Sequence, residues 1–171
     1  RETFGRMAMN DYETAALVAG GHTFGKSHGA ASESYKGPDP EASRLQDQST
    51  GWNSGYKSGK GVDAISSGIE GAWTQNPIKW DMGYLDCLYD HDWELTKSPA
   101  GAHQWTPKKN GQKIKMVPDA HQKGVLHPPM MQTTDISMKV DPSYGPITKH
   151  FHQNPKAVSY THLRAHETEA D

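Results

Sequence analysis

Apolar residues near the N-terminus recur at helical spacing. Ala15, Val18, Ala19 and His22 lie at positions i, i+3, i+4 and i+7, so all four share one face of a helix. Asn10 has Glu13 three residues on, the arrangement in which two side chains cap a helix start reciprocally. A shorter pattern of the same kind runs through residues 2–9. The pattern therefore predicts two consecutive helices, and the second ends at His22 beside two glycines.

Beyond residue 24, helix signals alternate with irregular stretches. Clusters of glycine, proline and polar residues predict a loop over residues 25–61, and a connection of that length inside a compact domain usually has a function. Helices are predicted over residues 80–93 and in the segment that opens at Pro142. The weaker signals are a short strand or irregular chain at residues 64–73, irregular chain at residues 106–129 and a weak alternation at residues 135–139.

The composition limits the size of the core. Of 171 residues only 22 are Leu, Ile, Val or Phe, which is low for a globular domain. A net charge of −2 and the presence of 5 Trp, 7 Tyr and 7 Met argue against a disordered chain. A domain of this length normally buries about two-thirds of its unfolded surface. We therefore expect this chain to need a cofactor, a partner or further polypeptide to complete its core.

Charge and hydropathy exclude two classes of function. With 18 basic and 20 acidic residues and a pI near 6.6, the chain lacks the basic surface that binds nucleic acid. Mean hydropathy is −0.86, and no apolar run approaches the roughly 18 residues that span a bilayer. Nothing at the N-terminus resembles a signal peptide. We expect partners that are neither nucleic acid nor membrane.

Histidine is the residue type that offers most chemistry. The chain has ten histidines and a single cysteine, Cys87, so an internal disulfide is excluded and a reducing compartment is compatible. No histidine pair has the spacing of a known zinc motif. His22 differs from the others because it ends an apolar helix face next to Gly20 and Gly21. Its spacing alone is typical of a core histidine as well as of a metal ligand.

The residues around His22 resemble a known haem-ligand motif. The segment Gly20-Gly-His-Thr-Phe-Gly-Lys-Ser-His-Gly29 is similar to the proximal motif of the bacterial-type catalase-peroxidases, bifunctional class I members of the plant, fungal and bacterial haem peroxidases. Other stretches resemble the same family in the same order, which makes a chance likeness negligible. They are residues 1–10, residues 63–74, residues 93–102, Thr134-Asp135 and Val140-Asp-Pro142.

The resemblance covers residues 1–157 and implies a mostly α, haem-dependent peroxidase fold, of which this chain is a fragment with long irregular loops. These residues would form the proximal part of the family's N-terminal haem domain. The family's distal Arg-Trp-His group would precede the chain, and a second, haem-free domain would follow it. From Val158 the likeness stops, and residues 158–171 resemble translated vector or adaptor sequence. We expect this tail, with His162 and His166, to be unrelated to the function.

The resemblance also implies a proximal site of three residues. His22 would be the axial ligand of haem iron, Asp135 its hydrogen-bond partner, and Trp73 the indole packed against the proximal face. A carboxylate that accepts from the far nitrogen of an imidazole increases the electron donation of that imidazole to iron. Trp73 would donate its N–H to the other oxygen of Asp135 and relay an oxidising equivalent. We therefore expect Asp135 within hydrogen-bond distance of His22 and Trp73, which lie 113 and 62 residues away.

Five further residues match family positions. Lys26, Ser27 and His28 would be neighbours of the haem propionates, because cationic and hydroxyl donors suit carboxylates. Ser67 would lie at the narrow part of the substrate channel, although an exposed turn would suit a serine equally well. Met7 matches the methionine of a covalent Met-Tyr-Trp adduct, whose other two members would precede this chain.

As a whole, the resemblance implies a cytoplasmic haem b enzyme that forms a homodimer or homotetramer. It would disproportionate hydrogen peroxide to water and oxygen and oxidise small organic electron donors, in response to oxidative stress. Two alternatives stay open at this point. One is a non-catalytic truncated fragment that binds haem weakly or does not fold, and the other is a peroxidase that lacks catalase activity.

Overall fold

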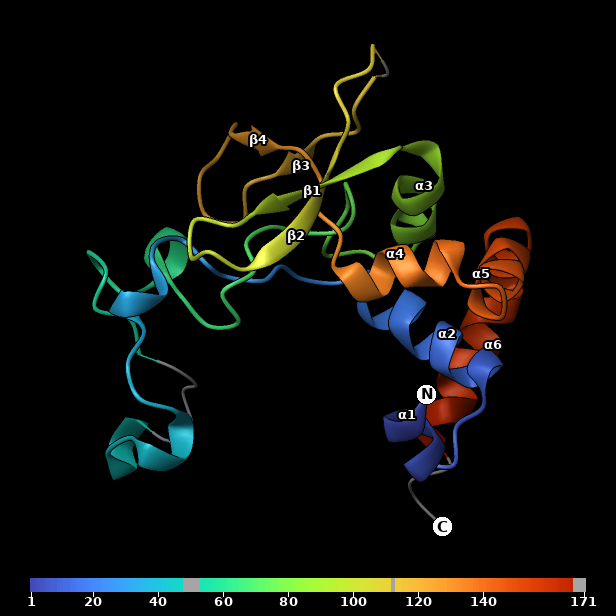
Figure 1. Ribbon diagram of the computed structural model, residues 1–171, viewed down its shortest axis with the longest axis horizontal. Coiled ribbons are helices and arrows are strands. Elements are labelled where there is room, and N and C mark those ends of the chain that lie inside the picture. The colour runs from blue at the N-terminus through green and yellow to red at the C-terminus, as the bar shows by residue number, and fades with distance from the viewer. Residues whose placement is uncertain (48–52, 112, 168–171) are drawn as a thin grey trace.

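The computed structural model describes residues 1–47, 53–111 and 113–167, and within these ranges it describes side chains to residue 162. Helices gather at one end of the molecule, short strands lie at its middle and an extended loop segment forms the other end (Figure 1). The helices are α1 (Glu2–Arg6), α2 (Asp11–Gly21), α3 (Gly83–Asp90), α4 (Thr133–Val140), α5 (Tyr144–Gln153) and α6 (Pro155–Glu167). The strands are β1 (Trp93–Lys97), β2 (His103–Pro107), β3 (Val117–Pro118) and β4 (Leu126–His127). Over the described residues, no helix combines the length and the apolar character that a bilayer span requires.

The helix that leads to His22 forms as the sequence predicts. At the start of α2, Asn10 Oδ1 accepts from the Glu13 amide at 2.9 Å and Glu13 Oε2 accepts from the Asn10 amide at 3.0 Å, so the capping box is confirmed. The alanine face of α2 is buried where the helix packs on α5 and α6. His22 follows directly as the C-cap, with its amide bonded to the Val18 carbonyl at 2.9 Å.

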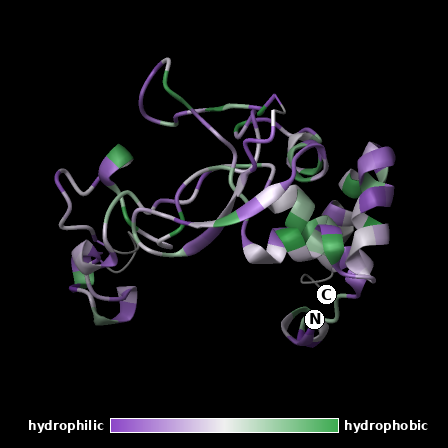
Figure 2. Cartoon of the chain, turned by 45° about the horizontal axis from the view of Figure 1, so that its top comes forward, coloured by the Kyte–Doolittle hydropathy of each residue, from purple (hydrophilic) through white to green (hydrophobic). Residues whose placement is uncertain are grey.

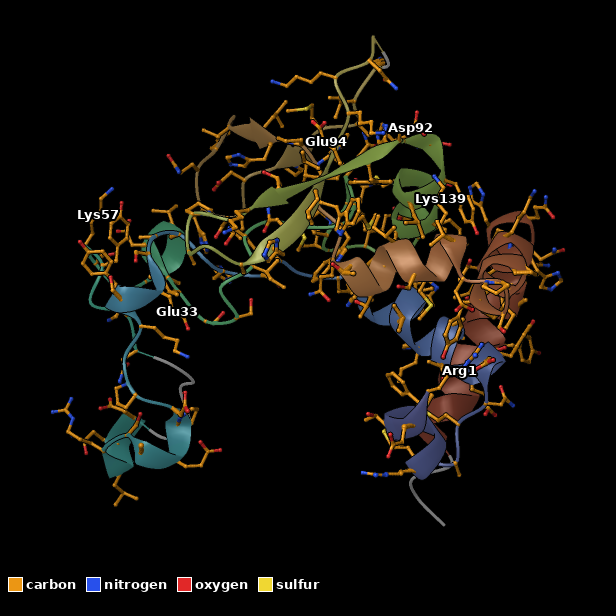
Figure 3. All side chains as sticks on the ribbon, in the orientation of Figure 1. Arg1, Glu33, Lys57, Asp92, Glu94 and Lys139 are labelled. Atoms are coloured by element: carbon orange, nitrogen blue, oxygen red, sulfur yellow. The ribbon has the colours of Figure 1, made fainter. Side chains whose placement is uncertain are left out.

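The core takes side chains from α2, α3, α4 and α5. Its fully buried members include Tyr84 and Leu88 from α3 and Phe151 from α5. The helices carry hydrophobic patches beside hydrophilic ones, as amphipathic helices packed on one core do (Figure 2). Lys139 extends from α4 toward the end of α3 (Figure 3), where its Nζ donates to the carbonyls of Leu88 at 3.0 Å and His91 at 3.1 Å. This cation satisfies carbonyls that a helix end leaves unpaired.

Two predicted segments are wrong in detail. The helix predicted over residues 80–93 is shorter at both ends, because α3 covers only Gly83–Asp90 and Trp93 begins β1. β1 pairs antiparallel with β2, with Trp93 opposite Pro107. The prediction is wrong here because the apolar pattern of one segment does not show that another segment pairs with it. The weak alternation at residues 135–139 is misleading too, because these residues lie in α4, where Asp135 and Met138 are buried at helical spacing.

The long connection after α2 is irregular, as predicted. Its short 3-10 helices are Glu33–Tyr35, Pro40–Ala42, Leu45–Asp47 and Gly61–Asp63, while its residues 48–52 lie outside the described part of the chain. Isolated bridges pair Ser27 with Gly71 and Gly29 with Ile65, so the segment at residues 64–73 is irregular chain. These bridges place the loop that follows α2 beside the chain that leads to Trp73.

The stretch over residues 106–129 is irregular except for the last two residues of β2, Thr106 and Pro107, and one small hairpin. Its strands β3 and β4 pair antiparallel, with Val117 opposite His127 and Pro118 opposite Leu126. Residue 112 of this stretch lies outside the described part of the chain. The helix predicted after Pro142 is confirmed as α5.

The last helix crosses residue 157, where the sequence analysis expects the likeness to the family to stop. α6 runs without interruption through Val158, whose side chain is buried in the core. Ser159 Oγ accepts from Trp80 Nε1 at 3.1 Å, and His162 Nδ1 lies 3.3 Å from the Ala16 carbonyl of α2. Residues 168–171 lie outside the described part of the chain. The division into residues 1–157 and a separate tail stays a prediction, with the first residues of that tail packed on the helical region.

Candidate functional site

A fully buried carboxylate lies in the helical region. Asp135 belongs to the first turn of α4 and has 0% of its surface exposed. Its Oδ2 accepts from the backbone amide of Gln132 at 2.7 Å, so the side chain also caps its own helix. His22, Trp73 and Tyr84 donate to it from three other segments. Each carboxylate oxygen thus accepts two hydrogen bonds, and these bonds replace the water that burial removes.

His22 reaches this carboxylate from the end of α2. Its Nδ1 lies 2.8 Å from Asp135 Oδ1. Because a carboxylate only accepts hydrogen bonds, Nδ1 carries the hydrogen, and in the neutral imidazole the free lone pair is then on Nε2. The His22 side chain is 24% exposed, whereas its carboxylate partner is inaccessible. This arrangement is typical of an imidazole that binds a metal ion through its second nitrogen.

Trp73 approaches from the irregular chain before α3. Its Nε1 donates to Asp135 Oδ2 at 2.9 Å. Its indole stacks on the His22 ring, with ring centroids 4.2 Å apart and planes 12° from parallel. The Met130 amide donates to the neighbouring Ala72 carbonyl at 3.0 Å and fixes the backbone there. The structure therefore brings His22, Trp73 and Asp135 together at the distances that the sequence analysis expected.

Tyr84 is a member of this group that sequence analysis missed. It lies in α3 with 1% of its surface exposed, and its Oη donates to Asp135 Oδ1 at 2.9 Å. Burial, together with the neighbouring negative charge of Asp135, raises the pKa of Tyr84 well above its usual value, so the phenol keeps its proton. No local pattern in the sequence marks it, because its partner lies 51 residues further along the chain.

A cavity of about 710 Å³ lies beside the loop that follows α2. Lys26 and His28 line it, with Glu70 and apolar residues such as Met130 around them. Lys26 Nζ forms an ion pair with Glu70 Oε1, and Glu70 Oε2 accepts from the Gly29 amide at 2.7 Å. The positive charge of Lys26 is therefore balanced within the wall of the cavity.

His28 meets a second histidine in the same wall. Its Nε2 lies 3.3 Å from Nε2 of His121, which comes from the segment between β3 and β4. Burial lowers the pKa of His28, the nearby charges of Lys26 and His121 act in the same direction, and the charge of Glu70 opposes them. His28 is therefore biased toward its neutral form. Sequence analysis missed His121 and Glu70 as members of this wall, because only the fold brings the three segments together.

The other residues singled out from the sequence lie apart from the carboxylate of Asp135. Ser27 joins the two loop segments through its backbone, donating to the Gly71 carbonyl at 2.9 Å. Ser67 is exposed, and its Oγ accepts from the Ile69 amide at 3.3 Å. Met7 follows α1 and is 46% exposed. The described hydrogen bonds and the cavity lining connect neither Ser67 nor Met7 to His22.

Comparison with known proteins shows which family the sequence resembles. The family model described as "Peroxidase" matches residues 1–154 of the chain. The chain is 61% identical over 166 residues to a catalase-peroxidase of Koribacter versatilis, an alignment that covers 96% of this chain and 22% of that protein. It is 56% identical over 166 residues to a catalase-peroxidase of Gloeobacter violaceus, with the same coverage. A catalase-peroxidase of Maridesulfovibrio salexigens is 58% identical over 165 residues, covering 96% of this chain and 23% of that protein. The chain thus spans less than a quarter of the length of these relatives.

Proposed function

This chain belongs to the peroxidase family, and we propose that it supplies the proximal side of the haem site of a catalase-peroxidase. The observation that carries the proposal is the buried Asp135 carboxylate that accepts from both His22 and Trp73. The likeness to catalase-peroxidases from three organisms supports the choice within the family.

The donor atoms at this site fit a haem iron. Asp135 occupies Nδ1 of His22, so the atom available to iron is Nε2 on a partly exposed ring. Haem iron in peroxidases takes a neutral imidazole of this kind. A carboxylate at the far nitrogen fixes the orientation of the ring and raises its basicity. Haem b, when bound, would supply the iron at which hydrogen peroxide is cleaved.

Asp135 and Trp73 are the residues that we assign to catalysis on this side. Asp135 holds the Nδ1 hydrogen of His22 and thereby increases the electron density that the imidazole can donate. Trp73 is stacked on His22 and hydrogen-bonded to the same carboxylate, so its indole is placed to give up an electron while Asp135 holds its N–H. A partner already in place lowers the cost of that charge change.

The loop residues are assigned to binding the rim of the haem. Lys26 and His28 line the cavity and Ser27 lies between them, so all three can offer donors to propionates. Lys26 uses one of its three donor positions on Glu70, which leaves two for a further carboxylate. Ser67, exposed on the segment that the loop bridges, is assigned to the substrate channel. Met7 is assigned as the methionine of the adduct found in this family.

The activity that follows is the disproportionation of hydrogen peroxide to water and oxygen, with haem-dependent oxidation of small organic donors. The whole protein would act as a homodimer or homotetramer in the cytoplasm, in response to oxidative stress. Residues 1–157 would belong to its N-terminal haem domain. These assignments rest on the likeness to catalase-peroxidases together with the Asp135 geometry.

Replacing the proposed axial ligand tests the proposal. In the full-length protein, His22→Leu should remove most of the bound haem, because it removes the nitrogen assigned to iron, and both oxygens of Asp135 already accept hydrogen bonds within the protein. The measurement is the visible spectrum and the haem-to-protein ratio after purification. His152→Leu is the matched control, since that histidine lies on α5 and, among the described residues, its Nε2 pairs with Asp86 at 2.9 Å and not with Asp135. An unchanged ferric Soret band in His22→Leu would contradict the assignment.

A further inference from the structure

Two donors meet at a single oxygen of the buried carboxylate. Asp135 Oδ1 accepts from His22 Nδ1 at 2.8 Å and from Tyr84 Oη at 2.9 Å. The other oxygen is occupied by Trp73 and by the Gln132 amide. The Tyr84 hydroxyl therefore bonds to the same oxygen, Oδ1, that polarises His22, whereas the Trp73 indole bonds to the other oxygen.

The position of Tyr84 is fixed by packing. Its side chain is fully buried in α3, and its ring meets the His22 ring edge to face, with centroids 5.7 Å apart and planes at 79°. α3 also packs against α4, the helix that carries Asp135. A buried phenol whose acceptor among the described residues is Asp135 holds one geometry, because leaving its hydroxyl unpaired would cost about 1–3 kcal/mol.

We propose, on the basis of the function assigned above, that Tyr84 is a positioning residue that limits how strongly Asp135 polarises His22. A hydrogen bond from Tyr84 withdraws charge from Oδ1, so less charge is available to the bond from His22 Nδ1. Removing the hydroxyl concentrates that charge on the His22 bond. The imidazole then donates more strongly to iron and favours Fe(III) over Fe(II).

Tyr84→Phe in the full-length, haem-loaded protein tests this proposal. The substitution keeps the ring and removes only the hydroxyl, and Asp135 keeps three donors. We expect the Fe(III)/Fe(II) midpoint potential to fall by an amount equal to a tenfold change in the ferric-to-ferrous ratio, which is about 59 mV for one electron. The iron–histidine stretching band of the ferrous protein should move to higher frequency.

Tyr89→Phe is the matched control. Tyr89 lies on the same helix, and its hydroxyl pairs with Thr148 Oγ1 at 2.8 Å and the Gly145 carbonyl at 3.2 Å instead of with Asp135. Its loss removes a phenol hydroxyl from α3 without touching the carboxylate. We expect the midpoint potential and the stretching band to stay at their original values.

The outcomes separate this proposal from the assigned function. If Tyr84 only fills the core, the potential and the band of Tyr84→Phe will equal those of the original protein, and the proposal is overturned while the haem assignment stands. A shift of the same size in Tyr89→Phe would also overturn it. An original protein without an iron–histidine band, or one whose band survives His22→Leu, would overturn both the assigned function and this proposal.

Discussion

The carboxylate of Asp135 and the ion pair of Lys26 with Glu70 lie in two regions of the proposed haem site, and the fold holds them differently. Asp135 is inaccessible and accepts from four donors that come from four segments of the chain. The side chains of Lys26 and Glu70 keep 14% and 27% of their surface exposed. One region is built from packed helices, and the other is the wall of a cavity between loops.

The difference indicates that the helical region fixes the proposed iron ligand, whereas the cavity wall can exchange partners when a ligand binds. A buried charge must have all its partners in place before any ligand arrives, because each missing hydrogen bond costs free energy of folding. The helical region therefore fixes the direction of His22 in advance. Groups in the cavity wall have partners that a ligand can replace, such as His121 beside His28. A carboxylate on the ligand would give His28 a stronger, charge-assisted bond.

The largest effect should come from removing the buried carboxylate. Asp135→Ala leaves four donors unpaired, so we expect the free energy of unfolding to fall by about 3–5 kcal/mol. Asp135→Asn keeps one acceptor oxygen, so its free energy of unfolding should fall less. This variant should retain haem, and its His22 should donate electrons to iron more weakly. Urea denaturation and visible spectra of the full-length variants measure both effects.

Asp86→Asn is the control for this change. Asp86 has a side chain that is 41% exposed and a single histidine partner, His152. We expect it to change the free energy of unfolding by less than about 1 kcal/mol. Equal losses in the free energy of unfolding for Asp135→Ala and Asp86→Asn would show that the buried carboxylate stabilises the fold no more than the exposed one.

A smaller effect should appear as a pH dependence from the helical region. His91 is 3% exposed, and its Nδ1 has no hydrogen-bond partner among the described residues. Burial lowers its pKa, the charge of Asp90 opposes this change, and the charges of Lys115 and Lys139 add to it. The unfolded chain then binds more protons than the folded chain at pH values between the two pKa values. The free energy of unfolding should fall as the pH drops below about 6.5 and level off below the pKa of the folded form.

Urea denaturation of His91→Phe across this pH range checks the sign. The variant should lose the part of the pH dependence that His91 contributes, whereas His103→Phe, at an exposed position of β2, should keep it. A steeper fall below pH 6.5 in His91→Phe would contradict the expected direction. His28 is also biased toward its neutral form, so it adds a dependence of the same sign in the cavity wall.

The smallest effect on stability should come from the cavity wall. Lys26→Met removes an ion pair between partly exposed groups, so we expect a loss of about 1 kcal/mol or less in the free energy of unfolding. Haem affinity should fall less than in His22→Leu, since a propionate contact is lost and the iron ligand is kept. Haem titration followed by absorbance compares the two variants. A loss of haem as complete as in His22→Leu would show that the loop region holds the cofactor as firmly as the helical region.

Much of the fold near His22 could be predicted from local spacing. The capping box at Asn10, the apolar face of α2 and the loop that follows it are all encoded within a few residues, because helix caps and helix faces depend on near neighbours. The trio of His22, Trp73 and Asp135 came from likeness to a family, since spacing alone left His22 between a core residue and a ligand.

Other features were decided only by the tertiary structure. Trp93 begins a strand because β2 lies beside it, and the weak alternation around Asp135 gives way to a helix whose buried face meets α3 and α5. Tyr84 joins the carboxylate across 51 residues, and His121 joins His28 across 93. Contacts at such separations depend on how the helices and loops pack, and no local pattern of residues specifies them. Likeness in the sequence proposed His22, Trp73 and Asp135 as one site, and packing decided that His22 and Tyr84 share one buried oxygen of Asp135.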